Sequence, residues 1–160
     1  MAITECSLAP KHGFIGLARV LLVDNDPASR LTLQTVLKAG GYYVDSAASA
    51  SEAVGKLDGQ QYELVLSDLR LESPEAGLKV LAHARMMDYK PATALISSHL
   101  ESGAGPVSAN GTHSPVTWEK SARKLLIEPE DVPGLLSKVA DLIGQRVTRR
   151  MRRELRLHRN

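Results

Sequence analysis

Apolar positions from residue 19 onward alternate between short continuous runs and longer segments with helical spacing. The continuous runs predict buried strands at residues 21–23, 42–44, 64–66, 92–97 and 124–128. The spaced segments predict helices after Asp26, after Ser49 or Ser51, around residues 78–84 and from Pro133 onward. Alternation of this length is typical of parallel βαβ units, and continuous apolar strands indicate a sheet covered on both faces. We therefore expect an α/β fold with a doubly wound parallel sheet.

Residues 98–121 interrupt the alternation, because they hold three glycines and two prolines and show no helical face. We expect a loop there, with at most a short helix. The chain then divides into an N-terminal extension at 1–18, a main domain at 19–145 and a C-terminal extension at 146–160.

Composition narrows the class of protein further. The chain has 160 residues, 43% of them hydrophobic and 24% charged, which is ordinary for a globular protein. Its one cysteine, Cys6, excludes an internal disulfide framework. No apolar run approaches the roughly 18 residues of a membrane span, and the first 14 residues lack the pattern of a secretory signal. We therefore expect a cytoplasmic protein.

The charge is distributed unevenly along the chain. Residues 146–160 hold seven arginines and one acid, a net charge of +6, whereas the rest of the chain carries −4. Apolar residues at every fourth position predict that the last helix continues to about residue 157. These are Ile143, Val147, Met151 and Leu155. Three interpretations stay open: a homodimer or partner contact, binding to phosphates of nucleic acid or a membrane surface, and a solvated terminus. No helix-turn-helix or zinc finger supports nucleic acid, so we favour a protein contact.

Acidic and polar residues follow four of the five predicted strands. Asp24 and Asn25 follow the first strand, Asp68 the third, Ser97 ends the fourth and Glu128 ends the fifth. Parallel strands bring these positions to one edge of the sheet, where ligand sites of such folds lie. Oxygen ligands suit Mg²⁺, and an aspartate beside Mg²⁺ can accept a phosphoryl group. The plainer interpretation is that aspartates after strands only cap helices.

Four segments resemble the receiver domain of bacterial two-component response regulators, over roughly residues 19–145. These segments are RVLLVDNDP at 19–27, LVLSDLRL at 64–71, LISS at 95–98 and LIEP at 126–129. The resemblance implies a flavodoxin-like (βα)5 sandwich with strand order 2-1-3-4-5, here with an extended basic C-terminal helix. It also implies transfer of a phosphoryl group from a histidine kinase, or from a phosphotransfer protein, to the aspartate after the third strand.

The resemblance also implies roles for individual residues. Asp68 would be the phosphoacceptor, and Ser97 would be the hydroxyl residue that binds the phosphoryl group. Mg²⁺ would be held by Asp24, Asn25, Asp68 and the backbone carbonyl of Arg70, weakly because Asn25 brings no charge. The signal would pass to a downstream protein partner.

Three positions depart from the family pattern. Asn25 replaces the second acid of the metal site, Leu125 replaces a frequent aromatic residue, and Glu128 replaces the lysine that binds the phosphoryl oxygens. A pair of unit charges about 4 Å apart at an effective dielectric near 20 interacts by about 4 kcal/mol, so Glu128 would oppose phosphorylation if it faces the phosphoryl group. It could instead become a metal ligand, or remain solvated at the rim.

These observations lead to a first hypothesis and its alternatives. The first is a single-domain response regulator with phosphoacceptor Asp68 and output through protein contacts, and not an enzyme with an external small-molecule substrate. The second is a degenerate pseudo-receiver that binds partners without phosphorylation. Nucleic-acid binding through the arginine-rich extension is a third, less favoured hypothesis.

Overall fold

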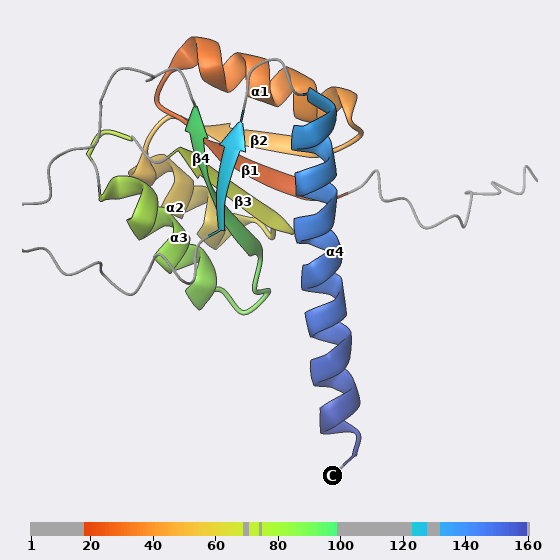
Figure 1. The fold of residues 1–160 in the computed structure, drawn as a ribbon. Helices are drawn as coiled ribbons and strands as arrows, with labels where there is room; N and C mark the ends of the chain where they lie inside the picture. The colour runs from red at the N-terminus through yellow and green to blue at the C-terminus, as the bar shows by residue number, and fades with distance from the viewer. Residues whose placement is uncertain (1–17, 69–70, 74, 99–122, 128–131, 160) are drawn as a thin grey trace, which may run out of the picture.

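The computed structural model describes residues 18–68, 71–73, 75–98, 123–127 and 132–159 (Figure 1). Its elements in chain order are β1 (Arg19–Val23), α1 (Pro27–Ala39), β2 (Tyr43–Ala47), α2 (Ala50–Gly59), β3 (Leu64–Asp68), α3 (Ala76–Met86), β4 (Ala92–Ser98), β5 (Arg123–Ile127) and α4 (Val132–Leu157). The predicted strands and helices are thus confirmed within two residues at their ends, except that β2 extends three residues beyond the predicted 42–44. The expected loop at 98–121 lies outside the described residues, apart from Ser98, which ends β4.

All five strands are parallel and lie in the order β2-β1-β3-β4-β5, which confirms the predicted topology. Helices α1 and α4 cover one face of the sheet, and α2 and α3 cover the other (Figure 1). Successive residues of β1 point to opposite faces: Val20 and Leu22 pack under α1 and α4, whereas Leu21 and Val23 pack under α2 and α3. Burial on both faces explains why the strands are continuously apolar.

The helix ends follow the capping residues visible in the sequence. The side chain of Asp26 accepts a hydrogen bond from the backbone N–H of Ser29 at the start of α1. In the same way, the hydroxyl oxygen of Ser49 accepts a hydrogen bond from the backbone N–H of Glu52 at the start of α2. Helix α1 ends at Gly40, and Gly41 follows with a φ of 92°, a conformation that glycine adopts without strain.

The last helix is the longest, with 26 residues, and it runs without a break past the predicted boundary at residue 145. Its first half packs on the sheet through Leu135, Val139 and Leu142. Its second half extends beyond the end of the sheet (Figure 1). Among the helices that the structure describes, none has the length and apolarity needed to cross a membrane.

Candidate functional site

Two aspartates lie side by side at the carboxyl edge of the sheet. Val23 of β1 is in register with Ser67 of β3. Asp24 directly follows Val23, and Asp68 directly follows Ser67. Asp24 is only 3% exposed, whereas Asp68 is partly exposed to solvent. The register therefore places the backbones of these two aspartates, which the sequence placed after the first and third strands, next to each other at this edge.

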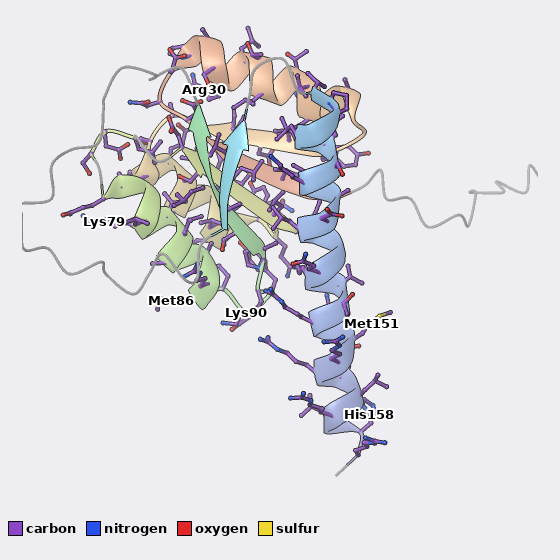
Figure 2. All side chains as sticks on the ribbon, in the orientation of Figure 1. Arg30, Lys79, Met86, Lys90, Met151 and His158 are labelled. Carbon is purple, nitrogen blue, oxygen red and sulfur yellow. The ribbon has the colours of Figure 1, made fainter. Side chains whose placement is uncertain are left out.

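Three hydrogen bonds fix the position of Asp24. Its backbone N–H donates to the carbonyl of Ala47 over 3.0 Å, and its Oδ1 accepts from the backbone N–H of Asp26 over 2.9 Å. Its carbonyl accepts from Nη1 of Arg30, in α1, over 2.8 Å. Arg30 thus holds a positive charge near the carboxyl ends of the strands (Figure 2). Arg30 lies only three residues after the recognised segment at 19–27, but no spacing in the sequence shows that its side chain reaches back to the carbonyl of Asp24.

The residues directly after Asp24 have different surroundings. The side chain of Asp26 is engaged as the cap of α1, so for this residue the helix-cap interpretation is correct. Asn25 is exposed, at the rim next to Asp24. Its amide oxygen is therefore available to a ligand from solvent.

The backbone around Asp68 is tightly packed against α3. The hydroxyl of buried Ser67 donates to the carbonyl of Asp68 over 3.2 Å. Gly77, near the start of α3, lies so close that a Cβ on it would be 2.5 Å from that carbonyl oxygen. Only a residue without a side chain permits this approach. Sequence analysis missed Gly77 as a positioning residue. The sequence shows a glycine in a predicted helix, but it does not show that this position packs against the carbonyl of Asp68.

The remaining predicted site residues are placed only in part. Asp68 is in register with Ile96 of β4, so the backbone of Ser97 lies one position beyond, at the same edge of the sheet. Ser97 is itself in register with Leu126 of β5. Arg70 and Glu128 lie outside the described residues.

The donor set at this edge consists of oxygen atoms, which is the chemistry that Mg²⁺ prefers. Among the described residues, no group of three or more histidines, cysteines or acids could hold a metal ion. In the predicted site, Asn25 stands beside Asp24 and brings an amide in place of a further carboxylate. The residues fit Mg²⁺ by chemistry, with less negative charge than three acids would give.

The strand order and the paired aspartates define an α/β domain with an acidic edge, of the CheY-like, flavodoxin-like class. A family model described as the response regulator receiver domain matches residues 20–106, which is more than half of the chain. The chain belongs to this family. The predicted family is thereby confirmed, although the matched residues end before the fourth of the segments, at 126–129.

Curated relatives are regulators that are much longer than the matched region. The gliding motility regulatory protein of Myxococcus xanthus is 36% identical over 78 residues, covering 49% of this chain and 10% of the relative. The transcriptional regulatory protein GlrR of Escherichia coli K12 is 27% identical over 128 residues, covering 80% of this chain and 27% of the relative. The chain thus spans a tenth to about a quarter of the length of these two relatives.

Solved structures show the same fold. The response regulator TrrA of Thermotoga maritima, in complex with Mg²⁺ and BeF, has a TM-score of 0.57 and 24% identity, covering 78% of this chain and 98% of that chain. TrrA also occurs in a complex with the histidine kinase ThkA, with a TM-score of 0.59 and 23% identity, covering 78% and 97%. NtrX of Brucella abortus has a TM-score of 0.67 and 20% identity, covering 88% and 29%.

Proposed function

We propose that this receiver domain accepts a phosphoryl group on Asp68 from a histidine kinase or a phosphotransfer protein, in the cytoplasm. The observation that supports this most is the register of β1 and β3, which sets buried Asp24 directly beside partly exposed Asp68. The kinase complex of TrrA, a protein of the same fold, points to the same class of partner.

The transfer is a displacement at phosphorus. A carboxylate oxygen of Asp68 forms a bond to the phosphorus of a phosphohistidine, and the bond from phosphorus to the imidazole nitrogen breaks. The nitrogen leaves with the electron pair of that bond. Asp24, Asn25, Asp68 and the carbonyl of Arg70 would hold Mg²⁺, which when bound neutralises negative charge on the phosphoryl oxygens.

The chain's own residues position the reacting groups. The three hydrogen bonds at Asp24 keep its carboxylate at the edge of the sheet before any ligand arrives. The absence of a side chain at Gly77 lets the carbonyl of Asp68 pack closely against α3. Ser97, one register position beyond the partner of Asp68, would donate its hydroxyl to a phosphoryl oxygen.

Phosphorylation by acetyl phosphate tests this proposal. The folded chain is incubated with the donor, with and without Mg²⁺, and its intact mass is measured. We expect a Mg²⁺-dependent gain of one phosphoryl group that Asp68→Asn abolishes. The matched control is Asp88→Asn, an exposed aspartate just after α3, which should leave the gain unchanged. If the folded chain gains no mass at any donor and metal concentration, the proposal is wrong.

The alternative is a pseudo-receiver that binds its partner without phosphorylation. The three departures from the family pattern, Asn25, Leu125 and Glu128, support it. It predicts that partner binding is equal for the wild type and for Asp68→Asn, before and after treatment with acetyl phosphate.

Output through protein contacts is the second half of the proposal. On the second half of α4, Val147, Met151 and Leu155 are 44%, 60% and 69% exposed. Such a stripe fits a downstream protein partner or a second copy of this chain. The single-domain architecture stays a prediction, since the matched relatives are longer regulators.

A further inference from the structure

A second feature lies at the end of the sheet opposite Asp68. Here residues 142–153 of α4 and the connection from α3 to β4 line an open pocket of about 600 Å³. Six basic side chains line it, and the one acid in the lining is Asp88. The basic residues are Arg85, Lys90, Arg146, Arg149, Arg150 and Arg153. A pocket with this charge excess concentrates anions from solution.

Arg146 anchors the wall of the pocket formed by α4. Its Nε donates to the carbonyl of Lys90 over 2.9 Å, and its Nη2 donates to the carbonyl of Tyr89 over 2.7 Å. These bonds tie α4 to the α3–β4 connection. Arg149, Arg150 and Arg153 follow at helical spacings of three, four and seven residues from Arg146, so they project from the same side of the helix.

The apolar stripe lies on a different side of the same helix. Val147, Met151 and Leu155 do not line the pocket, and Figure 2 shows Met151 pointing away from the body of the domain, with Lys90 on the other side of α4. The pocket and the stripe are therefore separate surfaces. A protein that covers the stripe leaves the pocket accessible.

The nearby acids balance only part of the positive charge in the pocket: Asp88 lies in the lining, and Glu63 acts electrostatically on Arg146. Arg150 pairs with Glu154 over 3.2 Å. Arg149 and Arg153 have no ion pair or hydrogen bond to any residue that the structure describes. Nη2 of Arg85 is buried and has no hydrogen-bond partner among those residues. A buried donor without a partner is unfavourable, and Arg85 is one of the residues that line the pocket.

We propose that this pocket binds a small ligand that carries two or more phosphate groups. Guanidinium groups present paired donors that match phosphate oxygens, and several lie around one pocket here. A single phosphate leaves most of the lining charge unmatched, whereas a di- or triphosphate chain reaches several arginines at once. The volume suits a small molecule. The ligand is either a linear polyphosphate or a nucleoside polyphosphate.

The pocket is independent of the phosphoacceptor. Ala92, which lines the pocket, is in register with Leu64 at the start of β3, whereas Asp68 ends that strand. Four residues of strand separate the two positions, about 13 Å. Phosphorylation of Asp68 and binding in the pocket can therefore succeed or fail separately.

Isothermal titration of the full chain at low salt tests the proposal. The probes are tripolyphosphate, ATP and inorganic phosphate. We expect one site per chain and an affinity for tripolyphosphate at least tenfold above that for inorganic phosphate. If ATP binds more tightly than tripolyphosphate, the pocket also contacts the nucleoside; if it binds equally, only the phosphates are recognised. Both results support the site.

A pair of double variants separates the pocket from the general charge of the helix. Arg149→Gln with Arg153→Gln removes two charges from the lining, and we expect at least a tenfold loss of tripolyphosphate affinity. The control is Arg152→Gln with Arg159→Gln, which removes the same charge from residues that do not line the pocket. It should change the affinity less than threefold. All four side chains lie on the exposed extension, so circular dichroism should show wild-type folding.

Two results overturn the proposal. One is the absence of measurable binding of any polyphosphate to the folded wild type. The other is an equal loss of tripolyphosphate affinity in the two double variants. That result would mean that the anion binds through the overall charge of α4 and not through the pocket. Duplex DNA is titrated in parallel. If it binds while tripolyphosphate does not, the extension is a nucleic-acid contact and the pocket is not a small-molecule site.

Discussion

The close approach of Gly77 to Asp68 leads to a prediction that can be tested without identifying the kinase or the downstream partner. Replacing Gly77 by alanine places a Cβ 2.5 Å from the carbonyl oxygen of Asp68, against ordinary contacts of 3.4–4 Å. The same Cβ would lie 3.3 Å from Ser67 Oγ, which is also closer than an ordinary contact. Either α3 or the end of β3 must move. Asp68 is the last residue of β3, and α3 packs against its carbonyl, so either movement would displace the surroundings of the acceptor residue.

The size of the effect follows from two opposing contributions. Overpacking of a well-packed site costs about 1–3 kcal/mol. Alanine in place of glycine in a helix contributes up to about 1 kcal/mol of stability. We therefore expect Gly77→Ala to lower the free energy of unfolding by about 1 kcal/mol. Gly55 is the matched control, because it is exposed within α2 and a Cβ there meets nothing within 4 Å. Gly55→Ala should raise the free energy of unfolding by about 1 kcal/mol.

Urea denaturation followed by circular dichroism measures both variants. With a slope of about 2 kcal/mol per molar urea, the midpoints of the two variants should differ by about 1 M. The rate of phosphorylation by acetyl phosphate should fall in Gly77→Ala and stay at the wild-type value in Gly55→Ala. If Gly77→Ala is stabilised as much as Gly55→Ala, the close approach of α3 to Asp68 does not constrain residue 77.

Four further predictions concern single positions. Asn25→Asp adds a carboxylate to the metal site, so the Mg²⁺ concentration for half-maximal phosphorylation should fall about tenfold; an unchanged value would contradict the ligand role. Glu128→Lys replaces repulsion by attraction, so the phosphorylated fraction at fixed donor should rise, and a fall would point to Glu128 as a metal ligand. Tyr62 donates a hydrogen bond of 2.8 Å to Asp45, and burial, followed by this bond, raises the pKa of Tyr62 above its usual value. Stability should therefore decline as the pH rises above about 10, and Tyr62→Phe should cost about 1 kcal/mol at pH 7 in urea denaturation and flatten that decline. Self-association through the stripe on α4 predicts a dimer in sedimentation equilibrium that Met151→Lys lacks; a wild-type monomer would favour a different partner for the stripe.

The sequence predicted the fold well because the strands are buried on both faces. The run from Leu21 to Val23 has no polar interruption, because β1 lies between β2 and β3 and is buried on both faces of the sheet. Asp26 and Ser49 marked the helix starts because their side chains satisfy backbone N–H groups that have no partner within the helix. These signals are local, so the chain displays them without any knowledge of tertiary contacts.

The site was predicted only in part, for the opposite reason. Asp24 and Asp68 follow strands whose order is set by topology, so their proximity could be inferred. The roles of Arg30 and Gly77 depend on how α1 and α3 pack on the sheet, and no spacing in the sequence records that packing. The basic pocket was missed for the same reason, since Arg85 and Arg153 are far apart in sequence and meet only because α4 crosses the α3–β4 connection.

Locating the phosphoryl group on the chain is the most direct test of Asp68 as its acceptor. The chain is treated with acetyl phosphate and Mg²⁺, digested, and analysed by peptide mass spectrometry. We expect the phosphoryl group on the peptide that contains Asp68, and no phosphoryl group when Mg²⁺ is removed by a chelator. A folded chain that stays unmodified, or that carries the group on a different peptide, would contradict this expectation.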